Sequence, residues 1–114
     1  MLRSLVLFST LVIGAPAQAM SLMETSWYGP GFAGRPMANG ETFNPRSMVA
    51  AHKTLPFGTR LRLTNPRTGR RAHVSVKDRG PFIKGRSLDV SRGAAEQLGF
   101  VAQGTAQLQV EILR

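Results

Sequence analysis

The stretch 73-HVSVKDRGPF-82 alternates valine with other residues until a Gly-Pro pair ends the alternation. This period of two predicts a half-buried strand that stops at the Gly-Pro pair. Side chains two residues apart on a strand share a face, so Val74, Val76 and Asp78 should point the same way. If the valines face a core, Asp78 lies at the rim of that core and is partly removed from water.

A carboxyl group at the rim of a core has two common uses. Burial favours the protonated form of a carboxyl group, and a protonated carboxyl group suits a general acid. An aspartate before a turn also accepts hydrogen bonds from the N–H groups of that turn. The strand pattern alone favours this second, structural use of Asp78, so the argument for chemistry depends on other residues.

The first 19 residues have the pattern of a secretory signal. Arg3 supplies a positive charge, residues 5–14 are apolar, and 17-AQA-19 is a small-residue cleavage site. As a helix the apolar run would be about 15 Å long, too short for the roughly 30 Å core of a bilayer. We therefore expect a cleaved signal at 1–19 and one exported domain at 20–114, with a retained anchor as the less favoured alternative.

The composition limits what this exported domain can be. The absence of cysteine from the sequence excludes a disulfide scaffold, a cysteine metal site and a lipid attached to a lipobox cysteine. The net charge of the full sequence is +9, or +8 once Arg3 is removed with the signal, and it favours an anionic partner. Export favours a wall polymer or a membrane surface over nucleic acid. We expect a soluble periplasmic or secreted protein without a membrane span, with solubility as the simplest role of the charge.

Alternating segments elsewhere predict a small, mainly β domain. Ser91 and Gly99 are suited to begin and end a short helix. About six short strands with one or two short helices favour a closed barrel over an open sheet. The strands are expected at 21–28, 48–52, 60–63, 72–78, 87–90 and 107–112.

Two further segments stand out by composition. The glycine-rich segment 29–47 predicts a mobile loop with few groups able to pack, and such loops often carry functional residues. The segment 60–71 predicts a basic outer face on a hairpin, and such a face is most often simply solvated. Its arginines are Arg60, Arg62, Arg67, Arg70 and Arg71.

Six short motifs together resemble a known family. They resemble the catalytic domain of the rare lipoprotein A family. Members of that family are septal lytic transglycosylases, and their wider relatives are expansins and barwin-type proteins. The resemblance implies a six-stranded double-psi β-barrel that cleaves the β-1,4 bond from N-acetylmuramic acid to N-acetylglucosamine and leaves a 1,6-anhydro end. The motifs are 26-SWYG-29, 38-ANGE-41, 50-AAH-52, 55-LPFGT-59, 78-DRGPF-82 and 89-DVS-91.

The same resemblance implies a catalytic group of Glu41, His52 and Asp78. A lytic transglycosylase uses the C6 hydroxyl of its substrate as the nucleophile, so one acid–base residue suffices, and acid–base help is worth about 10²–10⁴-fold. We assign this role to Asp78. Glu41 is expected to raise the pKa of a neighbouring carboxyl group and to stabilise oxocarbenium charge. His52 is expected to hydrogen-bond one carboxylate and orient it.

Five residues are expected to bind substrate. Trp27 and Tyr28 could stack on sugar faces, although an aromatic pair at the end of a strand is more often part of a core. Asn39 belongs to the Asn-Gly-Glu motif. Arg79 and Arg86 could meet muramyl carboxylates, with Arg79 equally able to brace the turn after the strand.

The sequence also bears on metal binding, on recruitment and on a non-catalytic alternative. His52, His73, Glu41 and Asp78 match no helical metal motif, and His73 should face outward, so we expect no metal and no cofactor. We expect a monomer that acts on glycan strands. Because no SPOR-type targeting domain follows the barrel, we also expect recruitment by a divisome or other envelope protein. The alternative is a non-catalytic, expansin-like module that binds or loosens peptidoglycan.

Overall fold

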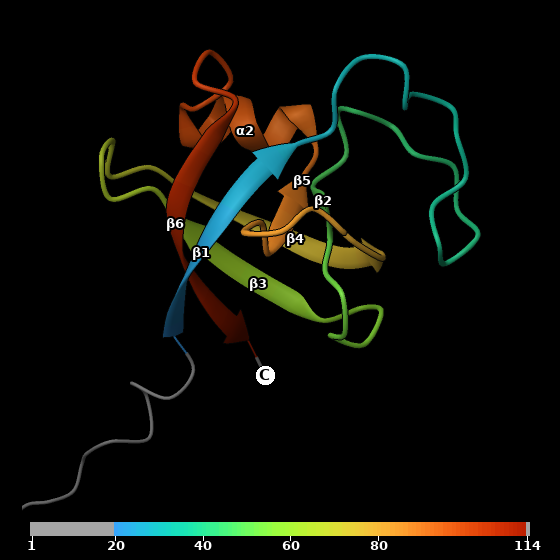
Figure 1. Cartoon of the computed structure of the whole chain (residues 1–114), viewed down its shortest axis with the longest axis horizontal. Coiled ribbons are helices and arrows are strands. Elements are labelled where there is room, and N and C mark those ends of the chain that lie inside the picture. Colours follow the sequence, from blue (N-terminus) through green and yellow to red (C-terminus); the bar gives the residue numbers. More distant parts are fainter. Residues whose placement is uncertain (1–19, 114) are drawn as a thin grey trace, which may run out of the picture.

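The computed structural model describes residues 20–113. The predicted signal at 1–19 lies outside the described residues, as does Arg114. The described chain folds into six strands and one helix, in agreement with the expected mainly β barrel (Figure 1). The elements are β1 (Met20–Trp27), β2 (Val49–Ala51), β3 (Arg60–Thr64), β4 (Arg71–Asp78), β5 (Leu88–Val90), α2 (Arg92–Leu98) and β6 (Thr105–Leu113).

The six strands close into a barrel in the order β1-β5-β2-β4-β3-β6. Two pairs, β1 with β5 and β2 with β4, are parallel, whereas the other four pairs are antiparallel. Parallel neighbours require crossover connections, which carry the chain over the barrel rather than back along a hairpin. Closure also removes the exposed edge strands that an open sheet would present.

Alternation decides which side chains fill the barrel. On β3 the leucines Leu61 and Leu63 are fully buried, whereas Arg60 and Arg62 point outward. On β4 the valines Val74 and Val76 are buried as predicted. The core is completed by residues of β5, α2 and β6 and by Phe100, because each of these elements also turns an apolar side inward.

The helix α2 has the two ends that the sequence predicts. The Ser91 hydroxyl accepts a hydrogen bond from the N–H of Ala94 at 3.3 Å, which satisfies a free donor of the first turn. Gly99 follows the helix in the left-handed conformation, with φ 81°, and donates its N–H to Ala95 O at 2.8 Å. No helix within residues 20–113 is long and apolar enough to cross a membrane.

The loop between β1 and β2 differs from the expectation. We expected few packing groups in this glycine-rich segment, but Met37 and Phe43 are buried and form a second apolar cluster with Val49 and the ring of Tyr28. A bridge between Pro36 and Thr42 closes the segment on itself. The loop therefore packs against the barrel through its own small core, so the expectation of a loop with little packing was wrong.

Candidate active site

Asp78 lies at the end of β4, and both oxygens of its half-buried carboxylate are hydrogen-bonded. Its Oδ1 accepts the N–H of Arg79 at 2.9 Å and the N–H of Ala38 at 2.8 Å. Its Oδ2 accepts the hydroxyl of Tyr28 at 2.8 Å. The contact with Arg79 is the turn contact expected of a structural aspartate, and the contact with Ala38 holds the β1–β2 loop against the carboxylate.

The strand itself is irregular just before Asp78. On the neighbouring β2, Ala50 pairs with Val76 but Ala51 pairs with Asp78, so the register shifts within this short interval. Such a bulge places an extra residue, Lys77, on β4 and changes the direction of the side chains that follow it. The alternation that correctly buries Val74 and Val76 therefore does not by itself set the direction of Asp78.

Tyr28 acts on Asp78 through its hydroxyl. Burial raises the pKa of Tyr28 well above its usual range, and the hydrogen bond to Asp78 and the charges of Asp78 and Asp89 raise that pKa further. The phenol therefore remains protonated and donates. Its ring lies edge-on to Phe43, with centroids 4.5 Å apart, and 5.6 Å from the ring of Phe32. These contacts fit the interpretation of Tyr28 as part of a core.

Trp27 fits the same interpretation. Its ring packs against the main core, and its indole N–H donates to Val101 O at 3.2 Å. The guanidinium of Arg92, on α2, lies 5.6 Å from the ring centroid. The described contacts of Trp27 thus tie the end of β1 to the helix side of the barrel, and sugar stacking by Trp27 stays a prediction.

Glu41 is held beside β4 but is paired with a lysine. Its carboxylate lies 2.9 Å from Nζ of Lys77, and the hydrogen bond from Lys77 lowers the pKa of Glu41. The side chain is 57% exposed. The side chain of Asn39 accepts the N–H of Glu41 at 2.9 Å, which shapes the loop, and the N–H of Asn39 donates to Lys77 O. Among the described hydrogen bonds and ion pairs, none joins Glu41 to Asp78.

His52 follows β2 and is bonded differently from the expectation. Its Nδ1 accepts the N–H groups of Thr54 and Leu55, both at 3.1 Å. Burial lowers the pKa of His52, and the positive charges of Lys53 and Arg79 lower it further. The ring is therefore neutral with its proton on Nε2. Among the hydrogen bonds of residues 20–113, none joins His52 to a carboxylate, so the expected bond is not made.

Arg79 braces the turn, which was one of its two predicted roles. Its guanidinium donates to Leu55 O at 2.8 Å and to His52 O at 3.2 Å. It also lies over the ring of Phe57, 4.0 Å from the centroid. These contacts fix the segment 52–57 next to Asp78, so Arg79 joins the end of β4 to the segment after β2.

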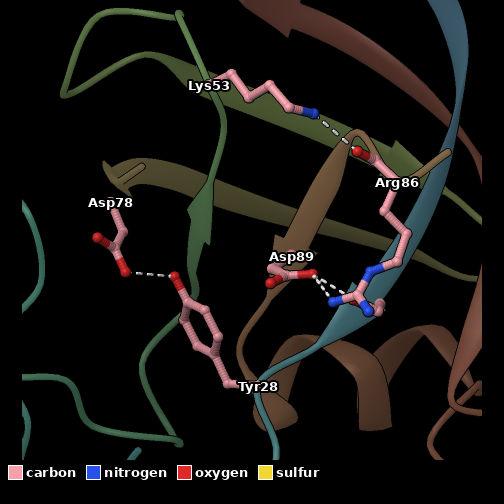
Figure 2. A network of polar contacts seen from close by, with 6 residues as sticks. Tyr28, Lys53, Asp78, Arg86 and Asp89 are labelled. Atoms are coloured by element: carbon pink, nitrogen blue, oxygen red, sulfur yellow. Dashed lines mark hydrogen bonds and ion pairs between the residues drawn. The ribbon is translucent and has the colours of Figure 1, made fainter. Parts of the chain in front are cut away.

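Arg86 forms an ion pair within the chain instead of presenting a free guanidinium. Its Nη2 lies 3.0 Å from Oδ1 of Asp89 (Figure 2). The hydroxyl of Ser26 donates to the same oxygen. The ammonium of Lys53 donates to the backbone O of Arg86 at 2.9 Å. The Nε of Arg86 is buried and makes no hydrogen bond within the described residues. Binding of a muramyl carboxylate by Arg86 would have to compete with Asp89.

Asp89 is a second aspartate at this end of the barrel that the sequence-based site did not include. Ala51 on β2 pairs with Asp78 on one side and with Asp89 on the other, so the two backbone positions are two strand spacings, about 10 Å, apart. The side chain of Asp89 is 14% exposed. The signal that could have found it was the Asp-Val-Ser motif, in which Asp89 alternates with the buried Leu88 and Val90.

His73 confirms a smaller expectation. It is exposed on β4, opposite Arg62 of β3, so it faces outward as predicted. Among residues 20–113, no group of three or more histidines and carboxylates is arranged to hold a metal ion. The candidate site therefore consists of Asp78 with its donors, the neutral His52, the ion-paired Glu41 and the charge pair of Asp89 with Arg86.

Comparison with known proteins gives the family. Residues 21–110 match the protein family described as lytic transglycolase. The chain is 56% identical over 85 residues to a probable endolytic peptidoglycan transglycosylase RlpA of a Nostoc species, covering 75% of this chain and 23% of the relative. It is 50% identical over 88 residues to the Campylobacter jejuni endolytic peptidoglycan transglycosylase RlpA, covering 77% and 32%. The chain thus spans a third or less of the length of these relatives.

Solved structures with the same fold have much lower sequence identity. A Streptomyces papain inhibitor superposes with a TM-score of 0.66 and 19% identity, over 83% of this chain and 94% of that chain. An expansin of Clavibacter michiganensis superposes with a TM-score of 0.65 and 23% identity, over 83% of this chain and 50% of that chain. Such likenesses establish the fold alone. The chain therefore has the double-psi β-barrel fold and belongs to the lytic transglycolase family.

Proposed function

We propose that this protein is an endolytic peptidoglycan transglycosylase that remodels the cell wall. It would cleave the β-1,4 bond from N-acetylmuramic acid to N-acetylglucosamine and leave a 1,6-anhydro end. The observation that carries the proposal is the bonding of Asp78, at the end of β4, in a chain that matches the lytic transglycolase family over residues 21–110. Relatives about half identical to this chain carry that activity in their names.

The hydrogen bonds of Asp78 assign the proton to one oxygen. A carboxylate oxygen has two lone pairs. Both lone pairs of Oδ1 are used by backbone N–H groups, whereas within residues 20–113 Oδ2 accepts only from Tyr28. Oδ2 is therefore the atom that would carry the catalytic proton and give it to the departing glycosidic oxygen. It would then take the proton of the C6 hydroxyl as the C6 oxygen bonds to C1. The carboxyl group ends the cycle protonated, as it began.

The remaining groups would stabilise charge around this transfer. Positive charge develops on the muramyl ring as the glycosidic bond breaks. Glu41, whose pKa is lowered by Lys77, is ionised near neutral pH and could face that charge. Asp89 supplies a second negative group whose charge is shared with Arg86. His52 would offer its Nε2 proton as a hydrogen-bond donor, because its Nδ1 is occupied.

Location and partners belong to the same proposal. A substrate in the wall requires export, which agrees with the signal expected at 1–19. We place the protein in the periplasm or outside the cell, acting on peptidoglycan strands as a monomer. Recruitment by a divisome or other envelope protein is part of this proposal.

The test is the product formed from purified sacculi, with and without stem peptides. The full exported chain should release anhydromuropeptides or anhydro-glycans that mass spectrometry identifies. Asp78→Asn should reduce release by at least 100-fold while the protein still pellets with sacculi. Glu96→Gln is the matched control, because Glu96 is an exposed carboxylate on α2 that pairs with Arg92. Equal release by wild type and Asp78→Asn would remove Asp78 from its role.

A second candidate function is peptidoglycan binding without cleavage, as in an expansin-like module. The barrel superposes on an expansin solved in complex with cellohexaose, with a TM-score of 0.66, and this shared fold is compatible with such a module. The same assay separates the two functions. Pelleting of the wild-type protein with sacculi, without any anhydro product, would reject the enzyme and support the binding module.

A further inference from the structure

Exposed aromatic rings lie around the candidate active site, and the proposed chemistry does not use them. Trp27 and Tyr28, the aromatic residues expected to stack on sugars, pack within the chain. In contrast, Phe82 is 78% exposed, and Phe32 and Phe57 are 48% and 43% exposed. We call these three phenylalanines the aromatic rim. Its rings are the aromatic surface that a ligand of this end of the barrel could reach.

The turn that ends β4 holds Phe82 close to Asp78. Gly80 and Pro81, which separate the two residues along the chain, are buried. A Cβ atom on Gly80 would lie 3.5 Å from Cε2 of Phe82, so the phenylalanine ring rests against the backbone of Gly80. Gly80 is two residues after Asp78, and two residues of chain span at most about 7 Å. The exposed ring therefore lies beside the aspartate.

The other two rings of the aromatic rim belong to loops that are tied to the same aspartate. Phe57 lies under the guanidinium of Arg79, 4.0 Å from the ring centroid, and Arg79 directly follows Asp78. The ring of Phe32 lies 5.6 Å from that of Tyr28, whose hydroxyl donates to Asp78. Figure 1 shows the β1–β2 loop and the arrow end of β4 on the same side of the molecule. A single residue thus separates each of these rings from Asp78.

Phe82 is the member of the aromatic rim that is best placed to bind a ligand. It is the most exposed large apolar side chain of residues 20–113, and Ile83 beside it is exposed as well. Contiguous exposed apolar surface commonly marks an interaction site. The ring of Phe82 therefore has a face available, whereas Phe57 is already covered by a guanidinium.

The nearness of Asp78 decides which ligand fits this ring. An apolar loop tip suits either the C–H face of a sugar ring or the interior of a lipid bilayer. The face of an aromatic ring is negative and attracts the polarised C–H groups of a pyranose. A bilayer drawn over Phe82 would also cover the end of β4, whereas a glycan strand has to lie across Asp78 to be cleaved. The position of the ring therefore favours the glycan.

We propose that Phe82 is a substrate-binding residue whose ring stacks on a sugar of the glycan strand next to the scissile bond. This assignment rests on the proposed function, because it takes the glycan as the polymer that reaches Asp78. The ring touches no atom that gains or loses a proton, so it binds the ground state and the transition state equally. Such binding lowers the amount of substrate needed for half-maximal rate and leaves the maximal rate unchanged.

The experiment is titration calorimetry of the full exported chain with purified stem-free glycan strands. All proteins carry Asp78→Asn, so that no strand is cleaved during the measurement. Adding Phe82→Ala should weaken binding about 5- to 50-fold, because the sugar loses an aromatic surface to cover. Phe82→Leu, which keeps an apolar side chain but has no aromatic face, should also weaken binding. Phe82→Trp should retain the affinity of the parent.

The matched control is Leu22→Ala, which removes an exposed apolar side chain from the part of β1 far from Ser26 and Asp89. It should bind glycan as the parent does. Thermal unfolding should be the same for all these proteins, since the replaced side chains are exposed. In the cleaving protein, Phe82→Ala should raise the amount of glycan that gives half the maximal rate and change the maximal rate by less than about twofold.

Three results would overturn the proposal. They are equal glycan affinity of the parent and Phe82→Ala, an equal loss of affinity in Leu22→Ala, and retained glycan affinity in Phe82→Ala with loss of binding to phosphatidylglycerol vesicles. The last result would identify Phe82 as a membrane contact. Release of anhydro products by the wild-type protein tests the proposed function alone. Its absence, with glycan binding that depends on Phe82, would reject the enzyme and leave Phe82 as the sugar contact of a binding module.

Discussion

The two oxygens of Asp78 differ in their hydrogen bonds, and this difference is the basis of the proposed chemistry. Oδ1 is fixed by two backbone donors, one from the turn after β4 and one from the β1–β2 loop. Oδ2 has a single side-chain donor, Tyr28. Removal of the Tyr28 hydroxyl should therefore change catalysis through Oδ2.

We predict that Tyr28→Phe lowers the rate of anhydro-end formation at saturating sacculi by about tenfold or more. A hydrogen bond to a charged group is worth about 1.5–3 kcal/mol, and the change removes that bond while the ring keeps its contact with Phe43. The amount of sacculi that gives half the maximal rate should change little, because no sugar contact is lost. An unchanged maximal rate would show that the hydroxyl does not position Asp78.

His52 predicts a dependence of stability on pH. Its pKa is lowered in the folded protein by burial and by Lys53 and Arg79. As pH falls below about 6.5, the unfolded chain binds this proton more readily than the folded chain, so the free energy of unfolding decreases. Chemical denaturation at pH 8 and pH 5 should show a smaller decrease for His52→Asn than for wild type.

The matched control for this measurement is His73→Gln, because His73 is exposed on the outer side of β4. It should keep the wild-type decrease between pH 8 and pH 5. If His52→Asn and His73→Gln behaved alike, the decrease would have to come from the carboxylates rather than from His52.

At the level of elements, one asparagine connects the hairpin of β3 and β4 to α2. Asn65 is buried, its amide donates to Leu98 O at 2.9 Å, and its carbonyl accepts the N–H of Arg67 at 3.0 Å. The hydroxyl of Thr68 donates to the same Leu98 O at 3.0 Å. The end of the helix is thus satisfied by side chains of the β3–β4 connection, in place of water.

We predict that Asn65→Ala lowers the free energy of unfolding by about 1–3 kcal/mol, because it leaves buried backbone groups with one fewer hydrogen-bond partner. Asn44→Ala is the control. The side chain of Asn44 accepts the N–H of Arg46 at 2.9 Å in the same kind of turn, but that turn is exposed. Urea denaturation should show a change of about 0.5 kcal/mol or less for Asn44→Ala. Similar losses in both variants would contradict the role of Asn65 in holding α2.

The second apolar cluster controls another element, the loop that carries Glu41 and Ala38. Phe43 is 4% exposed and packs with Met37, Val49 and Tyr28. Phe43→Ala should lower the free energy of unfolding by about 3–5 kcal/mol. It should also make residues 29–47 susceptible to limited proteolysis, which mass spectrometry of the fragments would detect. Leu22→Ala, at an exposed position of β1, should change neither measurement.

At the scale of the whole molecule, the barrel could be predicted from the sequence because its strands alternate and its helix has clear ends. The pattern of β3, β4 and β6 follows from Leu61, Val74 and Leu108, each of which is buried. Such signals are local, so a single strand or helix shows them. Closure of the barrel follows from having several short strands in a chain of this length.

The arrangement of charges at the site could not be predicted in this way. Glu41 meets Lys77, and Ser26 meets Asp89, only because the strand order brings distant segments together, whereas Arg86 and Asp89 are three residues apart in the sequence. The bulge before Asp78 depends on the register between β2 and β4. The packing of Met37 and Phe43 was also missed, since isolated apolar residues among glycines have no period. The resemblance supplied the candidate residues, whereas the strand order and register decide their hydrogen-bond and ion-pair partners.

The pairing of β1 with β6 has a practical consequence. Met20 lies opposite Glu111, so the first described residue and the end of β6 are neighbours on one side of the molecule. Met20 is six residues from Ser26, about 20 Å along β1 from the Asp89 network. Figure 1 shows the arrow end of β6 and the start of β1 on the same side of the molecule, away from the arrow end of β4. A bead or surface linked beside Met20 or beside Leu113 would hold the barrel with its aspartates facing outward, so an immobilised protein should still reach insoluble sacculi.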